Sequence, residues 1–206
     1  MKILLLLFLT SVLFSKTYPS FTKHELDTIS KSNKISKNRI DDYEKKVAFH
    51  KNNPKNVQLK GMNLYLNTLL PQYDDVIKNR LDDWATPKEF LTIGYGDCED
   101  YVIIKYYSLI RLGFDEKKLF LTRVKETFRG GHHMVLAYFK EKNRPPLILD
   151  NLSFKILDLK TRSDIKAEVF INSTGVYKIK KKFQLIKIAN KYKEFEELRT
   201  KVKNNH

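Results

Sequence analysis

Apolar residues follow two different spacings along this chain, one typical of helices and one typical of strands. Up to Gly113 they recur every three or four positions, as on one face of an amphipathic helix. Beyond Gly113 apolar and polar residues alternate, which is the pattern of a strand with one buried face. Helices followed by strands predict an α+β fold with an antiparallel sheet.

Two helices are predicted in the N-terminal third of the chain. The first carries Ile40 and Val47 on one buried face, and the second covers residues 57–70. Asn63 and Asn67 lie four positions apart on the second helix, so their amides share a face. These amides either meet solvent or turn toward a site.

A central helix is predicted to begin at Cys98 and to end before Gly113, a residue suited to the position just after a helix. It is apolar nearly all round, so we expect it to be buried against several elements. A shorter helix precedes it, because Thr86, Pro87 and Glu89 together form the pattern of a capping box with proline at the first helical position.

The pattern in the second half of the sequence predicts a sheet with short connections, followed by a C-terminal surface helix over residues 189–202. The predicted strands cover residues 119–125, 133–139, 147–152, 154–159 and 169–179, the last interrupted by a turn at 172–175.

The first residues resemble an export signal rather than a part of the fold. Lys2 precedes an apolar run over residues 3–14, which is too short to span a bilayer and is followed by polar residues. We expect a signal peptide at residues 1–18 and a single domain at 19–206 without a transmembrane segment. A length of 206 residues with 42% hydrophobic residues fits one globular domain.

The formal net charge of +15 does not by itself indicate nucleic-acid binding. The basic residues are scattered without interleaved aromatic residues, and an exported protein seldom meets nucleic acid. The densest basic run, residues 178–182, is more typical of a solvated strand edge. Acidic proteins or an anionic membrane surface are the better candidate partners.

Cys98 is the only cysteine and is a candidate nucleophile. The N-terminus of a helix favours a thiolate, which is the reactive form of the side chain. A buried, inert cysteine is the plainer interpretation, but the flanking Asp97, Glu99 and Asp100 argue against an apolar core. These acids also oppose thiolate formation, unless they hold a cation. Closely spaced carboxylates suit calcium better than zinc.

His133 and Asp150 are the expected partners of this cysteine. In an antiparallel pair joined by an even-numbered loop, paired residue numbers have an odd sum, which places His133 and Asp150 on one face. Cysteine, histidine and aspartate in this order occur in papain-like and transglutaminase-like folds, where they form a catalytic triad. Asn151 is an alternative to Asp150, and His132 has the wrong parity for the same face.

Several motifs in order resemble one family, the bacterial transglutaminase-like cysteine proteinases of the LapG type. The resemblance is closest from about residue 38 to residue 152, and little can be claimed beyond it. The matching segments cover residues 83–91, 94–100, 105–106, 133–136 and 147–151.

This resemblance implies a periplasmic, calcium-dependent endopeptidase. Members cleave a large surface adhesin near its N-terminus, typically after a pair of alanines, which disperses biofilm. An inner-membrane cyclic di-GMP receptor of the LapD kind sequesters them. The resemblance assigns Cys98, His133 and Asp150 to the triad and Asp97 and Glu99 to the calcium site, with Asp100 as a further candidate ligand.

Two other functions remain open at this point. The same site would act as a transglutaminase if an amine replaced water as the acyl acceptor. The chain would be a calcium-binding adaptor for a membrane receptor if the triad were vestigial. An intact triad argues against the adaptor.

Overall fold

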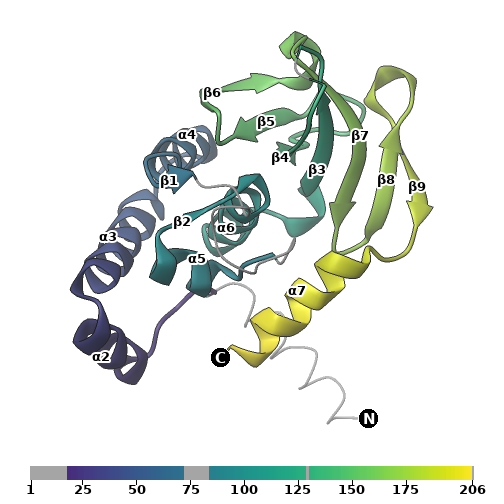
Figure 1. Ribbon diagram of the computed structural model, residues 1–206. Helices are drawn as coiled ribbons and strands as arrows, with labels where there is room; N and C mark the ends of the chain where they lie inside the picture. The colour runs from purple at the N-terminus through teal and green to yellow at the C-terminus, as the bar shows by residue number, and fades with distance from the viewer. Residues whose placement is uncertain (1–17, 72–83, 129, 206) are drawn as a thin grey trace, which may run out of the picture.

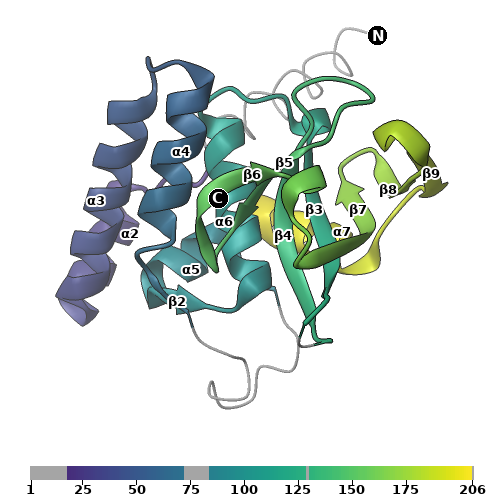
Figure 2. The ribbon, with the colours of Figure 1, turned by 90° about the horizontal axis from the view of Figure 1, so that it is seen from above.

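The computed structural model describes residues 18–71, 84–128 and 130–205. Its helices and its sheet form two layers, with α6 (Cys98–Arg111) between them (Figure 1). Seen from above, α3 (Lys34–His50) and α4 (Lys55–Leu66) lie on one side of α6 and the strands on the other (Figure 2). The predicted α+β fold and the buried central helix are thereby confirmed.

Local capping signals set the boundaries of the helices. Thr86 and Glu89 form the predicted capping box at the start of α5, and Gly94 ends α5 with a φ of 92°. Asp97 caps α6, which therefore begins at Cys98 as predicted. The remaining helices are α2 (Lys23–Ser32), α3 (Lys34–His50), α4 (Lys55–Leu66), α5 (Pro87–Ile93) and α7 (Lys193–Asn204), with short 3-10 turns η2 (Glu116–Lys118), η3 (Leu159–Thr161) and η4 (Lys181–Phe183).

An antiparallel sheet of seven strands runs in the order β6-β5-β4-β3-β7-β8-β9. A separate parallel pair, β1 and β2, connects the segment after α4 to the loop before Cys98. The strands are β1 (Leu70–Pro71), β2 (Tyr95–Gly96), β3 (Leu119–Glu126), β4 (His132–Tyr138), β5 (Leu147–Asp150), β6 (Ser153–Asp158), β7 (Ile165–Asn172), β8 (Gly175–Ile179) and β9 (Leu185–Ala189).

Both faces of this sheet are apolar. One face packs against α6 through residues such as Leu136 and Leu149. The opposite face holds a smaller core in which Phe120 meets Phe139 and Phe170 edge to face. The main core buries most of α6, which explains why that helix is apolar on almost every side.

Several boundaries differ from the prediction, and β7 begins at Ile165 rather than residue 169. α4 ends at Leu66 rather than residue 70, because the Asn67 side chain bonds to a neighbouring turn and Leu70 pairs with Tyr95. Strand β9 was not predicted, and α7 begins at Lys193 rather than residue 189. β9 pairs with β8 across the short turn at residues 180–184 and forms the edge of the sheet, and none of its residues is buried, so its sequence carries only a weak strand signal.

The predicted signal peptide, residues 1–18, lies outside the described residues except for Tyr18. Tyr18 is buried and packs edge to face on Tyr107 of α6. This contact makes Tyr18 part of the described core. Among the described residues no helix is both long enough and apolar enough to cross a bilayer.

Candidate active site

Cys98 occupies the first position of α6, beside the middle of the sheet. The Asp97 carboxylate accepts hydrogen bonds from the backbone N–H groups of Glu99 and Asp100, at 3.1 Å and 3.2 Å, and thereby fixes the start of the helix. Gly96 precedes this cap, and a Cβ there would lie 2.5 Å from Oδ2 of Asp100. The glycine is therefore needed for Asp100 to fold back over the loop.

The Cys98 sulfur lies next to strand β4. It receives a hydrogen bond from the backbone N–H of Met134, and its own thiol donates to Oε2 of Glu99 over 2.7 Å. β5 pairs with β4 only from Leu136 to Tyr138, so the ladder has already ended where the sulfur meets the strand. Because the β4–β5 ladder ends there, the first turn of α6 can approach strand β4.

The thiol is held in its protonated form in this arrangement. Burial raises the pKa of Cys98, and the negative charges of Glu99 and Asp97 raise it further. The Met134 N–H opposes this increase but does not cancel it. The acids around Cys98 therefore oppose thiolate formation, as the sequence predicted for a loop without a bound cation.

His133 and Asp150 form a buried pair beside this cysteine loop. Nε2 of His133 lies 2.9 Å from Oδ1 of Asp150, and the two residues are 8% and 1% exposed. The pairs between β4 and β5, such as Ala137 with Ile148, have an odd sum, so the predicted common face is confirmed. With Nε2 engaged, Nδ1 of His133 is the ring nitrogen left for a reacting group.

Arg162 holds the other oxygen of Asp150, a contact that sequence reasoning missed. Its Nη2 donates to Oδ2 of Asp150 over 2.8 Å, and Nε and Nη2 bind Asp164 at 2.8 Å and 2.7 Å. Burial raises the pKa of Asp150, but hydrogen bonds from His133, the Leu152 N–H and Arg162 outweigh it, so the pKa lies below its ordinary value. Asp150 is therefore ionised and fully hydrogen-bonded.

Arg162 reaches Asp150 because the chain crosses the sheet between β6 and β7. These strands lie on opposite sides of β5, β4 and β3, so the connection through η3 passes over the ends of the intervening strands. Hydrogen bonds from Thr127 to the carbonyls of Ser163 and Asp164 fasten this crossing to the end of β3. The only sign of this contact in the sequence was the presence of charged residues at positions 162 and 164.

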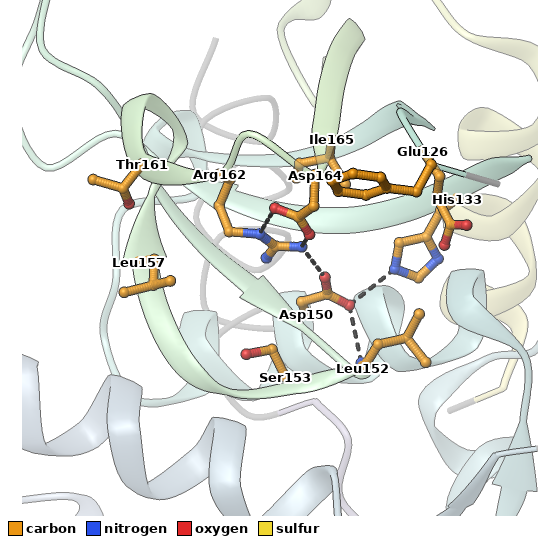
Figure 3. Close-up of a pocket in the computed structure, with 11 residues that line it drawn as sticks. Glu126, His133, Asp150, Leu152, Ser153, Leu157, Thr161, Arg162, Asp164 and Ile165 are labelled. Atoms are coloured by element: carbon orange, nitrogen blue, oxygen red, sulfur yellow. Dashed lines mark hydrogen bonds and ion pairs between the residues drawn. The ribbon is translucent and has the colours of Figure 1, made fainter. Parts of the chain in front are cut away.

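A cavity of about 430 Å³ opens beside the His133–Asp150 pair. Figure 3 shows Asp150 between His133 and Arg162, with Leu152, Leu157 and Ile165 around them. Phe128 also lines the cavity and is 86% exposed. Apolar side chains around a charged pair give a polypeptide a surface to contact.

The other candidates from the sequence have different roles. Asn63 and Asn67 bind other parts of the fold: their amide groups donate to carbonyls of residues at the β5–β6 turn, including the Asp150 carbonyl at 2.7 Å from Asn67. His132 points to the surface near Glu168. The His133 ring bonds Asp150, and Oδ1 of Asn151 has no partner among the described residues.

The profile of the bacterial transglutaminase-like cysteine proteinases matches residues 27–165, which is most of the chain. The chain belongs to this family. Among solved structures, LapG of Legionella pneumophila is 27% identical with a TM-score of 0.74, over 89% of this chain and 97% of that one. A search of curated proteins finds no match. The chain is thus a cysteine peptidase with a transglutaminase-like fold, similar to LapG.

Two further structures of the Legionella protein bear on the acids of the cysteine loop. Calcium-bound LapG is 27% identical with a TM-score of 0.70, over 85% of this chain and 98% of that one. EGTA-treated LapG is 27% identical with a TM-score of 0.73, over 86% and 97%. Proteins similar to this peptidase have therefore been solved with calcium and after treatment with a chelator.

The predicted calcium ligands of the peptidase make separate contacts. Asp97 caps α6, Glu99 accepts from the Cys98 thiol, and Oδ1 of Asp100 accepts from the Ala85 N–H at 2.8 Å. Within the described ranges, no three His, Cys, Asp or Glu side chains gather closely enough to hold a metal. The three carboxylates still offer the hard oxygen donors that calcium binds.

Proposed function

We propose that this peptidase is a calcium-dependent endopeptidase that cuts a large surface adhesin through a Cys98 acyl-enzyme. The observation that carries the proposal is the buried His133–Asp150 pair, joined at 2.9 Å, beside a cysteine at the start of a helix. Family membership and the likeness to LapG support a peptidase reaction at this site.

In the first half of the reaction, His133 takes the proton of the Cys98 thiol. The sulfur then attacks the carbonyl carbon of the scissile peptide bond, and a C–S bond forms. The backbone N–H of Cys98, at the first position of α6, is suited to stabilise the negative oxygen. When the imidazolium gives its proton to the leaving nitrogen, the C–N bond breaks and a thioester remains.

In the second half, water replaces the amine. His133 removes a proton from water, the hydroxide attacks the thioester carbon, and the C–S bond breaks. The new carboxylic acid leaves and Cys98 recovers its proton. Asp150 holds the imidazole through Nε2 and stabilises its positive form in both halves.

Arg162 has a positioning role in this scheme. It occupies Oδ2 of Asp150, so Oδ1 is the oxygen directed at His133. Its own second partner, Asp164, anchors it to the loop before β7. The aspartate is therefore fixed between two partners before substrate arrives.

The acids of the cysteine loop fit calcium by their chemistry. Asp97, Glu99 and Asp100 would hold it, since all three are carboxylates within four positions, and Gly96 leaves room for the Asp100 side chain. Calcium supplies positive charge there, which offsets the negative charges that oppose a thiolate. Glu99 would have to turn away from the Cys98 sulfur to take part.

The remaining parts of the proposal concern location, substrate and control. An N-terminal leader, predicted at residues 1–18, would deliver the chain to the periplasm, and the burial of Tyr18 favours cleavage before that residue. The substrate would be the N-terminal region of the adhesin, cut near a pair of alanines, with biofilm dispersal as the result. An inner-membrane receptor for cyclic di-GMP, of the LapD kind, would sequester the peptidase. These parts rest on the family resemblance.

The test is cleavage of an N-terminal adhesin fragment by the purified mature protein. We expect one discrete cut with calcium, none with chelator, and none for Cys98→Ala in calcium. Full activity in chelator would remove calcium from the scheme. If the fragment stays intact while an amine probe is incorporated into it, the site is a transglutaminase instead.

A further inference from the structure

Nearly half of the net positive charge lies in one short part of the chain. Residues 169–193 contain seven lysines and no acid or arginine, whereas the whole chain of 206 residues has a formal net charge of +15. The segment follows the region that the family profile matches, which ends at residue 165. All seven side chains are exposed: Lys178, Lys180, Lys181, Lys182, Lys187, Lys191 and Lys193.

These lysines sit on the edge of the sheet, on a feature that we name the basic hairpin, residues 175–193. It consists of β8, the η4 turn, β9 and the segment after it, and β9 is the outermost strand. Figure 2 shows it at the far side of the sheet from α3 and α4. Of its lysines, Lys193 alone is in an ion pair with a described acid, Glu197, at 3.8 Å.

The lysines extend in several directions from the hairpin. Lys178 pairs with Ile186 and Lys187 pairs with Tyr177, so the two lysines belong to opposite faces. Three consecutive lysines, at 180–182, make up most of the turn, where Lys182 and Phe183 both have a φ of 56°. The turn thus presents adjacent positive charges that no described acid neutralises.

The turn lies at the same end of the sheet as the candidate active site. Ile165 at the start of β7 pairs with Glu126 at the end of β3, and His133 pairs with Val124 close by. β8 runs antiparallel to β7, so residues 180–184 return to this end. The basic turn and His133 therefore share one rim.

We propose that the basic hairpin docks the protein on an anionic phospholipid surface. Clusters of four to eight basic residues are the size that binds anionic lipid through diffuse attraction. Lysine without arginine suits this mode, because a bidentate contact with a single phosphate or base would favour arginine. Ile188, which is 51% exposed, and Phe183 in the turn add apolar groups that can enter the headgroup region.

Docking in this way has a geometric consequence. Because the basic turn and His133 share a rim, the bound molecule would hold its active site close to the membrane plane. That consequence rests on the proposed peptidase function, whereas the docking itself does not.

The test is co-sedimentation of the mature protein with lipid vesicles. We expect binding to vesicles of phosphatidylglycerol and phosphatidylcholine, no binding to phosphatidylcholine alone, and loss of binding in 0.5 M salt at roughly a 4 Å Debye length. Lys180→Gln, Lys181→Gln and Lys187→Gln together should weaken binding about a hundredfold. Lys182 is left in place because of its positive φ.

The matched control changes three exposed lysines on the helical side: Lys34→Gln, Lys45→Gln and Lys51→Gln. It removes the same charge and should weaken binding less than about threefold. An equal loss in both triple variants would overturn the proposal in favour of general net charge. Binding of duplex DNA through these lysines, with no sedimentation on anionic vesicles, would overturn it in favour of nucleic acid.

Discussion

The two sides of the candidate active site differ in how their charges are balanced. On the acid side, Asp150 is bound by His133, Arg162 and a backbone N–H, so its negative charge is matched by protein groups alone. On the thiol side, Cys98 has acids on both sides of it, and its thiol donates a hydrogen bond to one of them, Glu99.

This difference shows which part of the site depends on something from outside. Burial and nearby carboxylates raise the pKa of Cys98, whereas the hydrogen bonds on the acid side lower the pKa of Asp150. We infer that groups of the protein alone keep Asp150 ionised, whereas Cys98 needs a bound cation to form a thiolate. Variants on the acid side should then change turnover, and variants on the thiol side should change the calcium requirement.

Replacing His133 should have the largest effect. His133→Ala removes the group that carries the proton, so kcat/KM at saturating calcium should fall about 10⁴-fold. His132→Ala is the matched control, because the His132 side chain is 65% exposed, and should change kcat/KM less than about twofold. Equal losses in both variants would contradict the assignment of the base.

Lys105 of α6 tests whether a buried positive charge near Asp150 is compensated by a partner. It is 1% exposed, and its Nζ has no hydrogen-bond partner among the described residues. Burial lowers its pKa from 10.5 to about 7, although the attraction of Asp150 raises it. Between these pH values the unfolded chain binds the additional proton, so stability rises with pH across this interval, and the penalty is fully present below pH 7.

Lys105→Met removes this penalty. It should stabilise the protein by about 2–5 kcal/mol at pH 6 and far less at pH 10. Urea unfolding at both pH values measures the difference. A change in unfolding free energy that is independent of pH would mean that Lys105 is charged and paired in the folded protein.

Arg162 tests whether Asp150 must be held from both sides. Arg162→Met should lower kcat about 10- to 100-fold with little change in KM, because Asp150 loses its fixed position. Arg162→Lys should restore part of the loss. The calcium concentration for half-maximal activity should not change in either variant. Arg199→Met, which removes a surface arginine paired with Glu196, is the control.

Replacing Asp97 should have the smallest effect, and that effect should be specific to the calcium requirement. Asp97→Asn keeps a capping oxygen but loses the charge, so the calcium needed for half-maximal activity should rise about tenfold with the same stability. Asp97→Ala should show the same calcium response and also lose about 1 kcal/mol of stability with the helix cap. An unchanged calcium response in Asp97→Asn would separate this residue from the calcium site.

Much of the fold follows from local signals in the sequence. The capping box at Thr86, the cap at Asp97 and the glycine after α6 act within a few residues, so the helix boundaries around Cys98 could be predicted. The alternation in β3 and β4 likewise sets which side chains share a face. β9 was missed because it is a short edge strand without a buried residue, so the pattern of apolar positions marks it only weakly.

The contacts of the site that depend on strand parity could be predicted. Those that depend on the connection crossing from β6 to β7 could not. His133 and Asp150 meet as the odd sum of paired residues required. Arg162 arrives on a connection between strands on opposite sides of the sheet, so its contact with Asp150 has no periodic signal. Asn67, at the end of α4, was named from its spacing to Asn63, but its partners, the carbonyls of Asp150 and Ser153, could not be predicted.

The most direct measurement is the mass of the intact protein during turnover of the adhesin fragment, quenched in acid. We predict a covalent adduct that adds the mass of the N-terminal product less one water, carried as a thioester on Cys98 and absent in Cys98→Ala. Cleavage without any adduct on Cys98, or cleavage that persists in Cys98→Ala, would contradict the assignment of Cys98 as the nucleophile.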